Sequence, residues 1–477
     1  MAQTIIANPQ KFTPAYNPIK YIVNSTNKNK TGFRYIYQVY NGATLLGTFK
    51  VLPTYSTGYG EIDLSKFLSS YVSWDFDPTL VTDLPAVNSY YNYDVNIGEE
   101  YLYELGYTSA LTASGTNTRI SVSNIFQVGD QINILQDDGG SANPLLEGLK
   151  TIIAVSGTLI DVNVPFSSIT DVNINGTISY ADNRKVVTYD ITEIANCRVF
   201  NGAFTWGEFA DYDDDNYNLN ADTKLWLTNQ PKTEFYSTLG QDLFLNAKPR
   251  MGKKIMFENN DGELFYKLVV SNDSITQVAV GANNYGTLTA VTGTLPLIKD
   301  DTTYYEFWYE DSGQKSIKYR VNLDKRTLTE EYQICFLDRL GSYSSFAFQL
   351  KNYERGEVTR DEFNKDVRGY VTGGEWKYNL DEFGFNTFNI NVSKTIELNT
   401  NWLNEQMASY FNELISSPQT FIKKVTYSCI DGIVATSTAY VPCIVQTNSY
   451  EVFKQRNKNL IKESISVKLA NNDNVNG

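Results

Sequence analysis

The residues best suited to chemistry lie in a short acidic run, in which carboxylates recur at alternating positions. Asp211, Asp213 and Asp215 occupy positions 1, 3 and 5 of this run, and Asp222 occupies position 12. Hard cations such as Ca²⁺ bind several carboxylate oxygens at this spacing. Position 6 is Asn216 where a calcium loop has Gly, and position 12 is a short Asp where Glu is expected. The run therefore predicts either a calcium loop or a solvated acidic turn that needs no cofactor.

Catalytic chemistry is restricted by composition, because the 477-residue chain has no histidine. This excludes Ser-His-Asp and Cys-His catalysis, histidine-ligated zinc and imidazole acid–base chemistry. Carboxylate pairs that hydrolyse glycosides remain possible, with Glu375 near Trp376 and Tyr378, and the pair at 381–382, as candidates. Neither has a distinctive spacing, and exposed strand and turn positions explain both. We therefore expect that the chain is not an enzyme.

The charge balance narrows the classes of partner. Asp and Glu number 54 against 40 Lys and Arg, which gives a net charge of -14. A surface that follows nucleic-acid phosphates needs clustered Lys and Arg, and the densest basic stretch, 454–462, is only moderate. We do not expect nucleic acid as the main partner.

No window approaches the length of an apolar membrane span, so we expect no membrane span. Residues 1–12 lack a leader pattern, so we expect synthesis in a cytosol.

The four cysteines are far apart in sequence and form no CxxC motif. They are Cys197, Cys335, Cys429 and Cys443. Cys429 and Cys443 are spaced to face each other across a hairpin, and unpaired thiols in the core are the alternative.

The composition predicts a mainly β fold. Tyr and Phe number 34 and 25, and these residues favour pleated sheets, as do Thr, Val and Ile. Sheet faces and cores explain most of the aromatic residues, with protein–protein interfaces and sugar-binding platforms as further explanations. We expect two β-sandwich (Ig-like) domains, a small inserted β-barrel, and a C-terminal α+β region with one amphipathic helix.

The first half of the chain reads as a sandwich interrupted by a barrel. Residues 1–107 plus 183–198 alternate in the manner of strands, and Asn41-Gly42 marks a hairpin turn. Residues 108–182 are poor in aromatics and rich in Ser, Thr, Gly, Val and Ile, with Gly-containing turns. The simplest account is a barrel of five or six strands inserted into the host sandwich.

The second half is predicted as a second sandwich, 199–350, followed by a C-terminal α+β assembly region, 351–477. Within the latter, apolar residues recur with helical spacing, and Thr400 and Pro418 bracket them as cap and stop. The residues of this stripe are Trp402, Leu403, Gln406, Met407, Tyr410, Phe411 and Leu414. A core face is one explanation for the stripe, and a partner interface formed by Trp402, Tyr410 and Phe411 is the other. The charged stretch Glu354–Asp366 is a candidate arm that orders against a neighbouring subunit.

Three segments, 9–40, 199–213 and 332–352, resemble parts of virion proteins of tailed phages that infect Bacteroidota, crAss-like phages included. The resemblance spans about two-thirds of the chain, excludes 108–182 and carries no defined functional residue. It implies a structural subunit that forms an oligomeric ring in the tail or the neck/connector, located in the virion. Its partners would be further copies of itself and other tail or neck proteins. The alternative is a receptor- or carbohydrate-binding protein at the tail tip, which would bind a host surface glycan.

Overall fold

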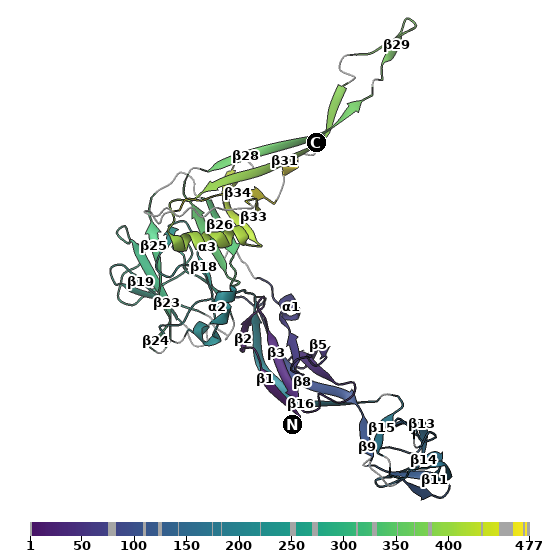
Figure 1. The fold of residues 1–477 in the computed structure, drawn as a ribbon. Coiled ribbons are helices and arrows are strands. Elements are labelled where there is room, and N and C mark those ends of the chain that lie inside the picture. Colours follow the sequence, from purple (N-terminus) through teal and green to yellow (C-terminus); the bar gives the residue numbers. More distant parts are fainter. Residues whose placement is uncertain are drawn as a thin grey trace. The chain divides into compact units, whose positions relative to one another are not determined.

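The fold is mainly β, as the composition predicts, and it divides into two compact units (Figure 1). The computed structural model describes residues 2–74, 83–107, 111–122, 126–141, 143–173, 175–182, 184–219, 221–248, 254–269, 275–311, 313–326, 332–350, 352–366, 368–379, 384–430, 433–447, 461–470 and 473–474. The first unit comprises Met1–Lys11, Pro18–Lys66 and Asn92–Arg198. The second unit comprises Phe12–Asn17, Phe67–Tyr91 and Val199–Gly477.

The first unit contains the predicted N-terminal strands in two sheets. One holds β1 (Gln3–Ala7), β3 (Lys20–Ser25) and β6 (Gly60–Asp63), and the other holds β4 (Arg34–Asn41), β5 (Thr44–Val51), β8 (Tyr90–Leu102) and β16 (Lys185–Phe200). Alternate residues of β4, namely Tyr35, Tyr37 and Val39, are buried. The predicted Asn41-Gly42 hairpin is confirmed: it joins β4 to β5, and Gly42 adopts a φ of 55°, which glycine tolerates best.

A sheet with its own core lies between β8 and β16 in the chain. Its strands are β9 (Glu104–Tyr107), β10 (Thr112–Ser114), β11 (Asn117–Ser121), β12 (Gln131–Gln136), β13 (Gly148–Ser156), β14 (Leu159–Pro165) and β15 (Gly176–Tyr180), with the short helix η2 (Phe166–Ser168) after β14. The sheet resembles half of a barrel. It begins at β9, a few residues before the predicted boundary at 108. Its core includes Ile132, Ile134, Ile160 and Val162, so it buries its own apolar face.

The second unit begins with a discontinuous stretch of chain and two facing sets of strands. Ala15, just after β2 (Phe12–Pro14), donates a hydrogen bond to the Phe200 carbonyl at 2.8 Å. One sheet holds β17 (Phe235–Thr238), β25 (Tyr319–Asp324), β23 (Tyr304–Asp311), β19 (Lys254–Asn259), β20 (Leu264–Leu268) and β22 (Thr289–Ala290), with β24 (Gln314–Lys315) beside β23. The other sheet holds β18 (Phe244–Ala247), β21 (Thr276–Ala279) and β7 (Leu84–Pro85). Two short helical segments precede β7 in the chain, α1 (Ser65–Leu68) and η1 (Ser69–Tyr71).

The last sheet shows that the predicted boundary at 350 is misplaced. Its order is β27-β26-β32-β33-β34-β31-β28, with β35 (Asp473–Asn474) beside β31. The strands are β26 (Tyr332–Leu337), β27 (Tyr343–Phe348), β28 (Tyr353–Lys365), β31 (Gly384–Asn399), β32 (Thr420–Ile430), β33 (Ile433–Val445) and β34 (Ser464–Leu469). Strands from both sides of residue 350 therefore share one sheet. Local alternation cannot reveal this, because it does not encode which distant strand is the hydrogen-bonding partner.

The predicted C-terminal helix is confirmed as α3 (Glu405–Ser416), but its cap differs from the prediction. Asn404 is the N-cap, and its Oδ1 accepts a hydrogen bond from the Met407 amide at 2.7 Å. Thr400 instead accepts a hydrogen bond from the Glu463 amide at 2.9 Å. Among the residues that the structure describes, no helix is long and apolar enough to cross a membrane.

The register of β32 and β33 separates the two cysteines that were spaced to face each other. Cys443 is opposite Thr420, whereas Cys429 is opposite Val434 at the far end of the hairpin. Cys197, Cys335 and Cys443 are buried free thiols, so the core-thiol explanation holds for these three.

Candidate functional site

The acidic run forms a turn between two short helices rather than a loop around a cation. Asp211 ends α2 (Trp206–Ala210), and Asp213 caps η3 (Asp214–Tyr217) by accepting a hydrogen bond from the Asp215 amide at 3.1 Å. The Asp215 carboxylate contacts the Asn218 amide at 2.7 Å and the Lys224 Nζ at 2.8 Å. The carboxylates of Asp213 and Asp215 therefore stabilise the turn itself.

The four acids Asp211, Asp213, Asp215 and Asp222 do not converge. Within the described ranges, no group of three or more Asp, Glu, Cys or His side chains is placed to hold a metal ion. The solvated-turn alternative accounts for the run, because capping aims a carboxylate at backbone amides of its own turn. The signal that would have shown this is the capping box formed by Thr205 and Glu208, which starts α2 just upstream.

A cleft of about 830 Å³ next to this turn is organised by one arginine. Arg339 binds both oxygens of Glu208, with Nη2–Oε1 at 2.7 Å, and its Nε lies 2.9 Å from Glu413 Oε1. Asn229 accepts a further hydrogen bond from Arg339. The hydrogen-bonded guanidinium lowers the pKa of the Glu208 carboxyl to about 2. The cluster therefore links α2, the β26–β27 turn and α3 through charge, and the guanidinium is already occupied by two carboxylates.

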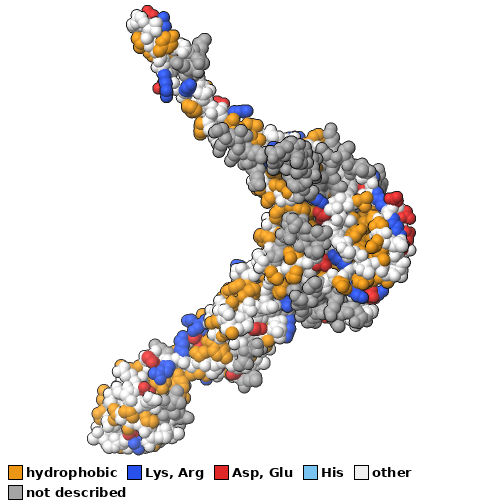
Figure 2. All heavy atoms as spheres, turned by 180° about the vertical axis from the view of Figure 1, so that it is seen from behind, with side chains coloured by type: hydrophobic (Ala, Val, Ile, Leu, Met, Phe, Trp, Pro, Cys, Tyr) orange, Lys and Arg blue, Asp and Glu red, His pale blue; other side chains and the backbone are white. Residues whose placement is uncertain are grey.

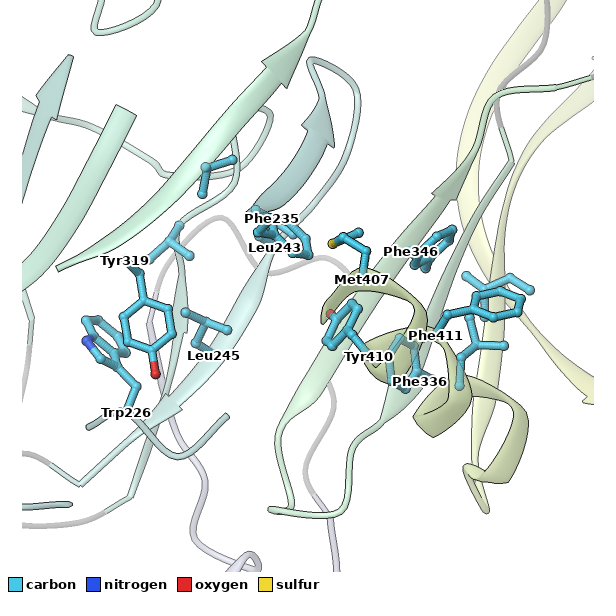
Figure 3. Packing of buried hydrophobic residues seen from close by; sticks show 14 of the residues in the cluster. Trp226, Phe235, Leu243, Leu245, Tyr319, Phe336, Phe346, Met407, Tyr410 and Phe411 are labelled. Carbon is cyan, nitrogen blue, oxygen red and sulfur yellow. The ribbon is translucent and has the colours of Figure 1, made fainter. Parts of the chain in front are cut away.

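Two of the three predicted interface residues, Tyr410 and Phe411 of α3, are core residues. Tyr410 and Phe411 are buried, and Figure 3 shows them directed at Phe336 and Phe346 of the sheet. The ring centroids of Phe411 and Phe346 are 5.1 Å apart, and the Tyr410 hydroxyl donates to the Ser345 carbonyl at 3.2 Å. An interface role for Tyr410 and Phe411 is therefore excluded, because no partner reaches them in the folded chain.

Trp402, the third predicted interface residue, is 63% exposed and precedes the helix. It lines a cavity of about 420 Å³ together with Tyr236, Phe346 and Met407. Trp402 is thus the one member of the predicted set that a partner can contact.

Exposed aromatic side chains are instead found together on a two-stranded ribbon. We use "the ribbon" for 353–366, 368–379 and 384–395, where 368–379 holds the tip hairpin of β29 (Tyr370–Thr372) and β30 (Glu375–Lys377). Strands β28 and β31 pair antiparallel from Tyr353↔Glu397 to Lys365↔Gly384, with a bulge at Asp361 and Glu362. They run side by side in Figure 1. Strand β28 ends the sheet order, so its outer backbone edge is open in the described chain.

Every β28 side chain is exposed, and large apolar side chains recur along the ribbon. Figure 2 shows hydrophobic side chains on it and at its tip. Those of the ribbon include Val358, Phe363, Tyr370, Val371, Trp376, Tyr378, Phe385 and Phe388. Phe385 and Phe388 are 76% and 67% exposed, and Phe388 meets Phe363 edge to face at 6.2 Å. Exposed aromatic side chains in such numbers are typical of interaction surfaces, because water solvates them poorly.

One candidate glycosidase acid, Glu375, belongs to the same exposed tip. Glu375 lies on β30, and its Oε2 lies 3.8 Å from the Lys377 Nζ. The pair at 381–382 lies outside the described residues.

Sequence reasoning singled out Glu354–Asp366 as an arm but missed the second strand and the aromatics. The available signal was that Phe363, Phe385 and Phe388 each stand in an otherwise polar stretch of the sequence. No protein-family model matches this chain, and no curated protein matches it significantly.

Proposed function

We propose that this chain is a structural subunit of a bacteriophage virion, forming an oligomeric ring in the tail or the neck/connector. The observation that carries the proposal is the exposed aromatic ribbon. A two-stranded ribbon is at best marginally stable by itself in water, and a third strand or a packed face is what stabilises it. Contact with a neighbouring subunit supplies both.

The composition of the ribbon fits a subunit contact. Interface cores are enriched in Phe, Tyr and Trp, which bring large rigid contact areas. The open edge of β28 offers backbone donors and acceptors to an added strand. Head-to-tail contacts between different surfaces of identical subunits generate closed rings, and an arm that reaches a neighbour is one such contact.

The resemblance of 9–40, 199–213 and 332–352 to virion proteins of tailed phages supports the same assignment. The partners are then further copies of this chain and other tail or neck proteins, and the location is the virion.

The test is electron microscopy of the purified full-length chain, together with mass spectrometry of purified particles. Wild-type protein is expected to form rings, and the variant F385S/F388S is expected to lose them while staying folded. The matched control is W206S, because Trp206 is equally exposed, at 77%, but lies on α2 rather than the ribbon. A monodisperse wild-type monomer that is also absent from particles would overturn the proposal.

A second candidate function is glycan binding at the tail tip, and one observation favours it. Trp376 and Tyr378 lie together at the ribbon tip with centroids 5.5 Å apart, and both are about half exposed. Sugars stack on exposed aromatic faces of this kind. A glycan array tests this function: binding that W376A abolishes supports it, and an array without hits counts against it.

A further inference from the structure

The inner face of the sheet that contains β20 carries a lysine. Lys267 of β20 is opposite Ile255 of β19, and Ile255 is opposite Tyr309 of β23. Directly opposed residues on neighbouring strands point to the same face, so these three side chains form one row. Ile255 and Tyr309 are fully buried, which identifies that face as the inner one. Lys267 therefore projects into the interior of the second unit.

Asp83, immediately before β7, meets this lysine from the facing sheet. The Lys267 Nζ lies 2.9 Å from Asp83 Oδ1, although the two residues are 184 positions apart. Their side chains are 7% and 9% exposed. Among the ion pairs of the described residues, no other has both side chains below 10% exposure. The amine and the carboxyl are therefore held together away from water.

The surroundings of Lys267 favour its neutral amine. Burial lowers the pKa of Lys267, since a desolvated ammonium is disfavoured. The compensating contacts are few: Lys267 also donates to the Ala279 carbonyl, and the Ala279 amide donates to Asp83 Oδ1 at 3.3 Å. Transfer of one proton within the pair gives a neutral amine next to a carboxylic acid, and neither group then carries a charge that needs water.

Tyr309 lies in the same row, on the other side of Ile255 from Lys267. The Tyr309 hydroxyl is buried and has no hydrogen-bond partner in the described chain. Burial, and then the nearby Asp83 charge, raise the pKa of Tyr309 well above its ordinary value, so the hydroxyl keeps its proton. Tyr309 therefore adds no second negative charge to the surroundings of Asp83.

We propose that Lys267 and Asp83 form a covalent amide cross-link within the folded chain. The neutral Lys267 amine attacks Asp83 Cγ and forms the C–N bond, while Oδ1 is held by the Ala279 amide. The nitrogen gives up one hydrogen to the departing carboxyl oxygen, which already carries the proton transferred within the pair. That C–O bond breaks and the oxygen leaves as water. The ammonium and carboxylate are thereby converted to one amide and one water, with no oxidant, cofactor or activating group required.

Proximity and dryness are the physical reasons for expecting the reaction. Groups fixed in contact react at effective concentrations far above those of free solutes. Water is excluded from the pair, so the amide, once formed, is protected from hydrolysis. The bond would join β20 to the chain leading into β7, and so would tie the two sheets of the sandwich covalently.

The experiment is the intact mass of the purified full-length chain. The cross-linked protein is expected to be one water lighter than its sequence, and tandem mass spectrometry is expected to find a branched peptide joining Lys267 to Asp83. K267R keeps the positive charge but removes the nucleophilic amine, so it should retain the full sequence mass. D83N should form the same amide by losing ammonia instead of water, and its mass should equal that of the cross-linked wild type.

The matched control is K423R, which alters another ion pair of the same unit, that of Lys423 with Asp242 at 2.8 Å. It should still lack one water. A wild-type chain with its full sequence mass would overturn the proposal, since an ion pair without the bond leaves the mass unchanged. Loss of water that persists in K267R would also overturn it, because a backbone dehydration elsewhere would then be the source.

Discussion

Strand β31 joins two regions that use large apolar side chains in opposite ways. At its C-terminal end Ile396 and Leu398 are buried in the core under α3, whereas Phe385 and Phe388 near its start are exposed on the ribbon. The first region is stabilised by burial within the chain. The second has equivalent side chains without an equivalent core. The difference teaches that aromatic content alone does not locate the core, and that a single strand serves both the fold and its contacts.

The two regions should differ most in how much stability is lost when an aromatic side chain is truncated. F411A removes a fully buried ring and should lower the free energy of unfolding by about 3–5 kcal/mol. F385A removes an exposed ring and should change it by less than about 0.5 kcal/mol in the isolated chain. Urea unfolding followed by fluorescence measures both. Equal losses in the two variants would mean that the ribbon is packed within its own chain.

A smaller effect on the free energy of unfolding is expected from the ion pair of Glu208 with Arg339 in the packed region. The folded-state pKa of Glu208 is depressed from 4.5 to about 2, so its contribution is present above pH 4.5 and is lost as the pH falls toward 2. Since Glu208 is partly exposed, we expect about 1 kcal/mol rather than the full shift. R339M should remove that pH dependence in urea titrations between pH 5 and about 2.

The ribbon supplies the control for this measurement. Arg355 and Glu397 pair at 3.2 Å across β28 and β31, in an exposed setting. R355M should leave the acid-dependent loss intact. If R355M and R339M flatten the profile equally, the contrast between the two regions does not extend to their charges.

Capping of α3 gives a similar or slightly smaller effect. N404A removes the acceptor for the Met407 amide and should destabilise the chain by about 1 kcal/mol. Q406A, on the exposed face of the same helix, should have little effect. Thermal unfolding by circular dichroism checks the pair, and an unchanged melting temperature in N404A would show that packing alone fixes the helix start.

The smallest expected effect is that of Ca²⁺ on the acidic turn, where we expect no change. Because Asp213 and Asp215 are engaged within their own turn, millimolar Ca²⁺ should neither release heat in calorimetry nor raise the melting temperature. A calcium-dependent rise that D215N abolishes would show that the turn rearranges around the ion.

The sequence predicts those parts of the fold that depend on residues close together in the chain. The alternation of Tyr35, Tyr37 and Val39, the Asn41-Gly42 turn and the apolar face of α3 each depend on neighbours within a few residues. Pairing over long distances is different. Nothing local to β26 indicates that its partner is β32, and nothing near Asp83 points to Lys267.

The candidate site shows the same limit. Trp402, Tyr410 and Phe411 share one apolar pattern, yet only Trp402 is exposed, because the helix begins after it. Which member of a stripe faces the core depends on where the helix starts and what packs on it. The spacing of the stripe contains neither piece of information.

The interleaving of the two units along the chain has a consequence for synthesis. Since β7 pairs with β21, a strand of the second unit leaves the ribosome about 190 residues before its partner does. Such remote contacts slow folding, because a long loop must close first. Neither unit can be expressed alone by a single cut, as each is assembled from three separate stretches. A chain of this kind reaches its final form only after nearly all of it has been translated.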